Sequence, residues 1–233
     1  MAMLTLDKVY HASYVLKNVI RMTDLIHAPN INPSGKVYLK TENLQVTGSF
    51  KVRGSYYKIS QLTDEEKSHG VIACSAGNHA QGVALAATKN GIKSIICLPD
   101  GAPISKVEAT KKYGAKVELV HGVYDDAYDR ALQLRDEKGY TFIHPFDDEN
   151  VIAGQGTIGL ELLDQLPEVD AVVVPVGGGG LIAGVAFAIK SLNPHVKVYG
   201  VQACGAASMV NALQKHQKET LSQVSTIADG IAV

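Results

Sequence analysis

Short apolar runs followed by segments of helical spacing repeat along most of this chain. The runs at residues 71–74, 94–98 and 116–120 each end in a turn that contains glycine, and a helical pattern follows each turn. Strands that alternate with helices predict a parallel sheet whose connections are right-handed crossovers. The fold class we expect is therefore α/β.

The remaining elements follow from the same periodicity. The expected helices span residues 79–90, 104–113, 124–138, 151–166, 181–192 and 206–218, and the later strands span 141–144, 170–176 and 197–202. The run at 170–176 is rich in valine and is typical of a strand buried on both faces. Gly154, Gly156 and Gly159 weaken the prediction of the helix at 151–166.

Charge and cysteine content exclude several classes of protein. The chain has 233 residues and a formal net charge of −1, so no strong field attracts nucleic acid or an anionic membrane. Cys74, Cys97 and Cys204 are widely spaced, which favours small buried residues over a metal site or a disulfide framework. Residues 1–8 lack the apolar core of a signal peptide, and the uncharged window 171–189 contains four consecutive glycines and a proline, which favours a strand and helix over a membrane span. We expect a cytoplasmic protein without a bound metal.

Four consecutive glycines, Gly177, Gly178, Gly179 and Gly180, lie between an apolar strand and a helix. They could form a tight turn only, but such a run carries a high entropic cost on folding. That cost is understandable if backbone N–H groups converge on an anion at the positive end of the helix. A dinucleotide site is disfavoured, because its glycines belong at the first strand with an acidic residue after the second.

The segment Ser75-Ala76-Gly77-Asn78-His79 also follows a strand and opens a helix. Ser75 or Asn78 could be an ordinary helix cap. Ligands of parallel sheets bind beyond the carboxyl ends of the strands, where both loops fall. We therefore interpret this segment as a loop that holds a carboxylate, with the Asn78 amide free to bond a ring oxygen.

Lys51 follows a small polar turn and an aromatic ring in Thr47-Gly48-Ser49-Phe50-Lys51. One lysine among 22 Lys and Arg residues would be unremarkable by itself. A lysine whose pKa is lowered by burial forms a Schiff base with an aldehyde. Together with the glycine loop and the amide loop, Lys51 predicts pyridoxal 5'-phosphate as the cofactor.

These three motifs resemble the signature of fold-type II pyridoxal phosphate enzymes. The stretches His144-Pro145-Phe146-Asp147-Asp148 and 151–157 (VIAGQGT) narrow the resemblance to the threonine/serine dehydratases. The resemblance implies a two-lobed, three-layer αβα fold with mostly parallel twisted sheets. It places residues 1–48 and 153–233 in a large lobe and residues 49–152 in a small lobe.

The resemblance also assigns roles to the residues of the three motifs. Lys51 would be the Schiff-base lysine that removes the Cα proton, and elimination of the β-hydroxyl would convert threonine to 2-oxobutanoate or serine to pyruvate, with release of ammonia. Ala76 stands where related serine racemases carry a second acid–base serine, so elimination is favoured over racemisation. The implied cofactor contacts are Phe50, Lys51, Asn78, Gly177, Gly178, Gly179, Gly180 and Leu181, and the implied substrate contacts are Ser75, Ala76, Gly77 and His79.

The sequence departs from the family pattern in two places. Asp24 replaces a proline near the start, and the chain ends at Val233 where family members continue. We therefore expect the large lobe to lack its C-terminal part, leaving an unpaired sheet edge, exposed apolar surface and poor solubility. An inactive fragment that binds the cofactor is the alternative to an enzyme. By resemblance alone, the partners would be an amino-acid substrate, other copies in a homodimer or homotetramer, and a nucleotide effector.

Overall fold

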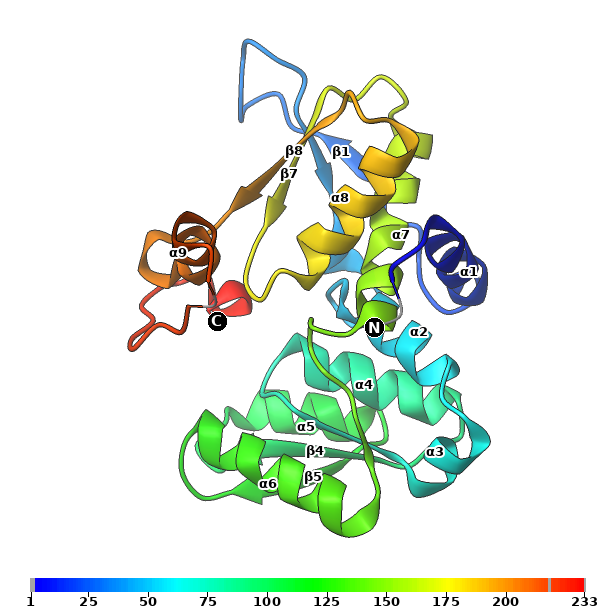
Figure 1. Ribbon diagram of the computed structural model, residues 1–233, viewed down its shortest axis with the longest axis vertical. Helices are drawn as coiled ribbons and strands as arrows, with labels where there is room; N and C mark the ends of the chain where they lie inside the picture. Colours follow the sequence, from blue (N-terminus) through cyan, green and yellow to red (C-terminus); the bar gives the residue numbers. More distant parts are fainter. Residues whose placement is uncertain (1–2, 218, 233) are drawn as a thin grey trace.

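The computed structural model describes residues 3–217 and 219–232, which form two parts that meet at helix α2 (Figure 1). The elements are α1 (Leu6–Leu16), β1 (Leu25–His27), β2 (Tyr38–Lys40), α2 (Lys51–Ser60), α3 (Asp64–His69), β3 (Val71–Cys74), α4 (Asn78–Lys89), β4 (Ser94–Pro99), α5 (Ile104–Lys112), β5 (Lys116–Val120), α6 (Tyr124–Lys138), β6 (Thr141–Phe142), α7 (Glu149–Gln165), β7 (Ala171–Pro175), α8 (Gly180–Leu192), β8 (Lys197–Val201) and α9 (Ser208–Lys215), with short 3₁₀ turns at Glu42–Leu44, Cys204–Ala206 and Asp229–Ile231.

The part that contains α3 to α6 is a three-layer sandwich, the lower half of Figure 1. Within the described residues its sheet is parallel, in the order β5-β4-β3-β6. Successive side chains of a strand point to opposite faces. In β3, Val71 and Ala73 join the apolar cluster beneath α4, whereas Ile72 and Cys74 join the cluster beneath α6. Helices on both faces bury β3 completely.

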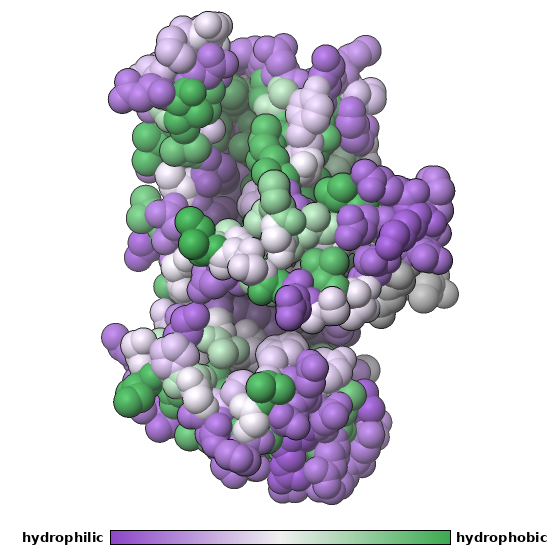
Figure 2. Space-filling view, turned by 90° about the vertical axis from the view of Figure 1, so that its left-hand side faces the viewer, coloured by the Kyte–Doolittle hydropathy of each residue, from purple (hydrophilic) through white to green (hydrophobic). Residues whose placement is uncertain are grey.

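The other part is built on the parallel pair β7–β8, the antiparallel pair β1–β2 and the helices α1, α7 and α8. A groove of about 1140 Å³ runs between β7 and the segment that contains β1 and β2. Figure 2 shows apolar residues exposed on the upper part of the molecule. Helix α7 packs against α2 and α8 and so links the two parts, and residue 152, where we predict a lobe boundary, lies inside this helix.

Strand β7 corrects one expectation. The apolar run predicts burial on both faces, but Val173 is 64% exposed and only Val174 of this strand is buried. Among the described residues, β7 pairs with β8 alone, and only one face of the pair packs against the apolar cluster of α7 and α8. The predicted exposed apolar surface is therefore present at this pair, where Tyr199 and Val201 are also about half exposed.

Most predicted elements are confirmed, with small shifts at their ends. The helix expected at 206–218 spans only Ser208–Lys215, because His216 adopts the left-handed conformation that ends it, and Lys218 lies outside the described residues. The strand expected at 141–144 is limited to Thr141–Phe142. Helix α7 begins at Glu149, earlier than expected, because the Asp148 side chain accepts hydrogen bonds from the backbone of residues 150 and 151.

The three cysteines are free thiols. Cys74 and Cys97 are buried as predicted, but the prediction is wrong for Cys204, which is exposed in a 3₁₀ turn after β8. Across residues 3–217 and 219–232, no helix has the length and apolar character needed to cross a membrane.

Candidate active site

Lys51 begins helix α2 directly after a tight turn. Gly48 has a left-handed φ of 73° and donates its N–H to the Gln45 carbonyl at 2.7 Å, and the Ser49 hydroxyl accepts the Lys51 N–H at 3.3 Å. The Lys51 Nζ donates to the Pro145 carbonyl at 2.9 Å and lies 5.4 Å from the centre of the Phe50 ring. Burial lowers the pKa of Lys51 to about 8. The amine is therefore partly neutral near physiological pH, as a nucleophile requires.

The loop after β3 lies close to this lysine. The Ser75 hydroxyl accepts the Gly77 N–H at 3.2 Å, and Gly77 caps helix α4 without a side-chain hydrogen bond. Asn78 is the first residue of α4 and is exposed, and Ala76 is half-buried. The free N–H groups of a helix N-terminus favour an anion. The loop thus offers backbone donors and an amide side chain, as the sequence predicts.

The His79 ring has a different environment from the rest of that loop. It is 3% exposed, and its Nε2 donates to the Ile143 carbonyl at 2.8 Å while Nδ1 lies 3.5 Å from the Ser55 hydroxyl. Burial, together with the charge of Lys51, lowers the pKa of His79 to about 3, so the ring is neutral. The ring ties α4 to α2 and to the end of β6. Because the ring is engaged in these contacts, only the backbone N–H of His79 is left to serve the predicted carboxylate loop.

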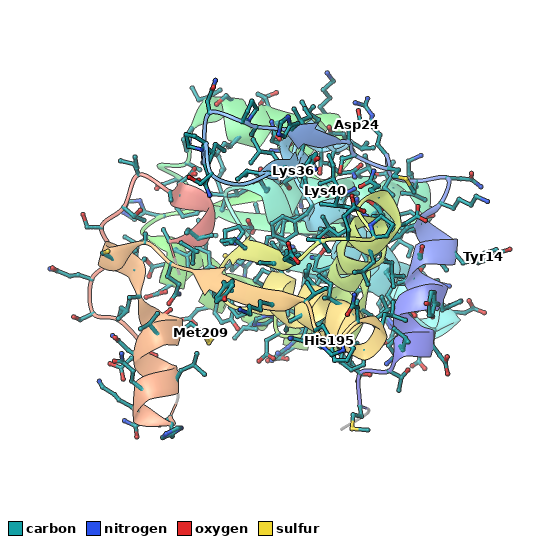
Figure 3. The ribbon with its side chains drawn as sticks, turned by 90° about the horizontal axis from the view of Figure 1, so that it is seen from above. Tyr14, Asp24, Lys36, Lys40, His195 and Met209 are labelled. Carbon is teal, nitrogen blue, oxygen red and sulfur yellow. The ribbon has the colours of Figure 1, made fainter. Side chains whose placement is uncertain are left out.

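The glycine loop Gly177–Gly180 joins β7 to α8 in a tightly packed setting. A Cβ on Gly178 would lie 2.4 Å from the Phe146 ring, and one on Gly180 would lie 2.6 Å from the Phe146 carbonyl oxygen. Gly179 has a left-handed φ of 87° and lies beneath the methyl group of Met209, which α9 carries (Figure 3). Side chains are therefore excluded at Gly178 and Gly180, and L-residues are strained at Gly179. The run of glycines is explained by this packing as well as by its place at a helix N-terminus.

Residues 143–147, which we name the bridge segment, bring the motifs together. The His144 Nδ1 accepts the N–H groups of Phe146 at 3.3 Å and of Asp147 at 2.8 Å, which folds the segment into a turn. Its Pro145 carbonyl accepts Lys51, and its next residue packs on the glycine loop. The sequence marked this segment only as a family feature. A backbone carbonyl that accepts a lysine has no signature in side-chain type, so sequence alone could not reveal this role.

An aldehyde cofactor with a phosphate group needs an amine of lowered pKa and an anion cradle close to it. Lys51 supplies the amine, and no acidic residue lies in the first turn of α8. Phe50 directly precedes Lys51 and Leu181 directly follows the glycines. Both pack against the same apolar cluster and line the groove. The residues present therefore fit pyridoxal phosphate.

The pKa of Lys51 also predicts an effect on stability. The folded-state pKa of about 8 lies below the ordinary value of 10.5, so the unfolded chain binds more protons between these pH values and stability rises with pH across that window. Below pH 8 Lys51 is charged in both the folded and the unfolded chain, so the full cost of burying its charge lowers the stability. The shift corresponds to about 3 kcal/mol, from which about 1 kcal/mol is subtracted for the hydrogen bond to Pro145.

Lys51→Met should therefore raise the free energy of unfolding at pH 7 by about 2 kcal/mol. Urea unfolding of the cofactor-free chain from pH 6 to pH 10 would measure it, and the gain should shrink above pH 8. Lys58→Met is the matched control on α2, because Lys58 forms an ion pair with Asp148 at 2.8 Å and its loss should not stabilise. A Lys51→Met chain no more stable than wild type at pH 7 would contradict the prediction.

Comparisons with known proteins agree with this geometry. The L-threonine ammonia-lyase of Thermotoga maritima is 52% identical over 233 residues, which cover 99% of this chain and 58% of that protein. Among solved structures, the processed form of threonine deaminase isoform 2 from Solanum lycopersicum superposes with a TM-score of 0.92 and 41% identity, covering 97% of this chain and 64% of that one. Maize serine racemase superposes with a TM-score of 0.94 and 36% identity, covering 98% and 70%.

The chain thus spans 58% of the length of the curated relative named first. The family model described as pyridoxal-phosphate dependent enzyme matches residues 16–233. The predicted cofactor and the predicted α/β fold with a parallel sheet are confirmed at the level of this family. Given the lysine, the glycine loop and the match over nearly its whole length, the chain belongs to the family of pyridoxal-phosphate-dependent enzymes.

Proposed function

We propose that the protein that contains this chain removes the hydroxyl and amino groups of L-threonine, releasing ammonia and 2-oxobutanoate, and acts in the same way on L-serine to give pyruvate. The observation that carries this proposal is the half-buried Lys51 amine, held by Pro145 beside the segment that packs on the glycine loop. The similarity to an L-threonine ammonia-lyase and to a threonine deaminase supports this choice of substrate.

Pyridoxal phosphate, when bound, supplies an electron sink for the electron pair left at the substrate Cα. Lys51 would hold the cofactor covalently and then, once released by the substrate, take the Cα proton. A pKa of about 8 suits an amine that removes and returns a proton near neutral pH. Gly177–Gly180 and Leu181, at the start of α8, would hold the phosphate, with Phe50 packed beside the ring.

The substrate contacts would come from the loop after β3. The loop of Ser75, Ala76, Gly77 and His79 would bind the carboxylate through backbone N–H groups and the Ser75 hydroxyl, and the exposed Asn78 amide would bond the cofactor's ring oxygen. Ala76 has no group that transfers a proton, so Lys51 would act as a single base on one side of Cα. A single base favours elimination over inversion.

Serine racemisation is the second candidate function, because the superposition with maize serine racemase has a TM-score of 0.94. A chain that binds the cofactor without turnover is the third. The division into residues 1–48, 49–152 and 153–233, a homodimer or homotetramer, a nucleotide effector and a cytoplasmic location stay predictions from the resemblance.

An absorbance spectrum of the purified chain with pyridoxal phosphate tests the proposal. A visible band that is lost in Lys51→Ala but kept in Lys58→Ala, on the same helix, would establish the lysine. Reduction with borohydride and mass spectrometry should then find the cofactor on the peptide that carries Lys51. Production of 2-oxobutanoate from threonine would establish the reaction, whereas D-serine from L-serine without ketoacid would favour racemisation. A band with neither product would favour the non-catalytic alternative.

A further inference from the structure

Phe146 makes an unusual contact for an aromatic residue. A Cβ built on Gly178 would lie 2.4 Å to 2.5 Å from three atoms of the Phe146 ring, so the ring lies directly on the glycine backbone. A Cβ on Gly180 would lie 2.6 Å from the Phe146 carbonyl oxygen and 2.9 Å from its Cα and Cβ. One residue thus packs against two of the four glycines, through its side chain and its backbone.

The ring is not part of the apolar core. Among the described residues, Phe146 belongs to none of the four buried apolar clusters, and it is half-buried. Its nearest aromatic partner is His144, at 4.7 Å between ring centres and an interplanar angle of 89°. An ordinary core phenylalanine would be surrounded by aliphatic side chains. Phe146 instead rests on the backbone of a functional loop.

The other end of the bridge segment is anchored to the lysine side of the site. The Ile143 carbonyl accepts the buried His79 ring, and the Pro145 carbonyl accepts the Lys51 Nζ. His144 closes the turn between these contacts by accepting the N–H groups of Phe146 and Asp147. The residue that accepts the lysine, Pro145, and the residue that packs on the glycines, Phe146, are therefore neighbours in a hydrogen-bonded turn, and this link is too short to stretch.

We propose that Phe146 is a positioning residue, which sets the distance between the glycine loop and the Lys51 amine by packing on Gly178 and Gly180. The inference rests on the proposed function, in which the loop holds a phosphate and Lys51 holds the aldehyde carbon of the same molecule. A cofactor held at two points gains affinity from both only when their spacing lets it engage both at once, and that gain is on the order of 100-fold or more. Phe146 should therefore affect a ligand that contacts the glycine loop and Lys51 together, and should not affect a ligand that contacts only one of them.

Two cofactor forms separate this role from a general loss of structure. Pyridoxal 5'-phosphate would contact both the glycine loop and Lys51, whereas pyridoxal lacks the phosphate and would contact Lys51 only. Phe146→Ala should weaken pyridoxal 5'-phosphate binding by about 10-fold to 100-fold, leave pyridoxal binding within about 2-fold and leave the unfolding midpoint of the apo chain nearly unchanged. Phe146→Leu should recover part of the loss. Titration of the visible absorbance band, with fluorescence of the apo chain as a second readout, measures both affinities.

Phe142→Ala is the matched control. Phe142 lies in β6, four residues earlier, and its ring packs edge-on to Tyr128 and joins the cluster beneath α6. Phe142→Ala removes the same aromatic group from a position packed against that cluster. It should lower the unfolding midpoint and leave the ratio of the affinities for pyridoxal 5'-phosphate and pyridoxal unchanged. A Phe146→Ala chain that loses both forms equally and unfolds earlier, as Phe142→Ala does, would reduce Phe146 to a structural residue.

A double variant keeps the proposal testable if Phe146→Ala alone folds poorly. Gly178→Ala should weaken pyridoxal 5'-phosphate binding, because the new methyl group collides with the Phe146 ring. Adding Phe146→Ala should then restore part of the affinity rather than lower it further, since contacting residues are not additive. Additive losses would overturn the proposal. So would tighter binding of pyridoxal 5'-phosphate to Phe146→Ala, because the ring would then obstruct the loop.

Failure of the proposed function gives a different result. The wild-type chain would then show no Lys51-dependent band with either cofactor form, and the Phe146 comparison would have no signal to change. The Phe146 proposal is tested where the wild-type chain does show that band, and it then fails on any of the overturning results named above, including identical behaviour of the Phe146→Ala and Phe142→Ala chains.

Discussion

Replacing Arg53 with methionine is expected to lower the free energy of unfolding by about 3–5 kcal/mol. Arg53 lies on α2, two residues after Lys51, and its side chain is 0% exposed. Burial opposes its charge, but its hydrogen bonds to the Glu42 and Glu161 carboxylates, together with their negative charge, outweigh burial and raise its pKa. Removing the guanidinium leaves two carboxylates largely buried and without their main partner, which is the costly way to break a buried ion pair.

The contacts of Arg53 explain the size of this effect. Its Nε and one terminal nitrogen donate to Glu42 at 2.9 Å and 2.8 Å, and both terminal nitrogens donate to Glu161, at 2.6 Å and 3.0 Å. Lys40, which Figure 3 labels, reaches Glu161 from β2 at 2.6 Å. Thr157 on α7 accepts a further hydrogen bond from Arg53 at 3.1 Å. The network therefore joins α2, which carries Lys51, to β2 and α7.

Urea unfolding of the apo chain, with two probes to check two-state behaviour, is the measurement. Arg130→Met is the matched control, because Arg130 is one-third exposed and meets Glu118 at 3.3 Å, so its loss should cost less than about 1 kcal/mol. Arg53→Met with Glu42→Gln should recover part of the loss, since Glu42 is then uncharged and Glu161 keeps Lys40 as its ion-pair partner. An Arg53→Met chain as stable as Arg130→Met would show that the buried network contributes little.

Gly184→Ala is expected to destabilise the chain by about 3 kcal/mol or more, against the usual helix preference for alanine. A Cβ at this position of α8 would lie 2.2 Å from the Ile152 carbonyl oxygen and 2.7 Å from the Gly156 nitrogen. Both atoms belong to the backbone of α7, which a side-chain rotation cannot move aside. The two helices would have to separate, and α8 carries the glycine loop at its N-terminus.

Thermal unfolding together with titration of pyridoxal phosphate would show both consequences. Ser191→Ala is the control on the same helix, at an exposed position near its end, and it should change stability by less than about 0.5 kcal/mol. A stabilised Gly184→Ala chain would mean that α7 and α8 are not packed as closely as described. Lowered stability with unchanged cofactor affinity would show that the contact between α7 and α8 stabilises the fold but does not position the glycine loop.

The glycines of α7 show what sequence reasoning could and could not predict. Gly154 and Gly159 weaken a helix prediction because glycine is a poor helix former. In the structure a Cβ on Gly154 would lie 2.6 Å from the Cα of Gly54 on α2, and one on Gly159 would lie 2.9 Å from Ala188 on α8. These glycines permit two helices to approach α7 closely. Propensity describes an isolated helix, so the partner that makes glycine necessary was invisible in the sequence.

Within the candidate site, the sequence predicted functional residues by their type, and the structure supplied their contacts. Lys51, Asn78 and Gly177–Gly180 were predicted because a nucleophile, an amide and a glycine run are unusual residue types in those positions. The inward ring of His79 and the carbonyl of Pro145 were not found, because hydrogen bonds to backbone carbonyls depend on the fold and not on residue type. The exposed face of β7 was missed because burial depends on which elements cover a strand.

The amino-acid sequence by itself determined the order of strands and helices from residue 71 onward, the three motifs and the family, because periodicity and rare residue combinations are local properties. Only the tertiary structure decided how the motifs meet. The bridge segment brings Lys51 and the glycine loop together although 126 residues separate Lys51 from Gly177 in the numbering. Contacts between residues so far apart depend on packing across the whole chain, and packing is a property of the folded molecule.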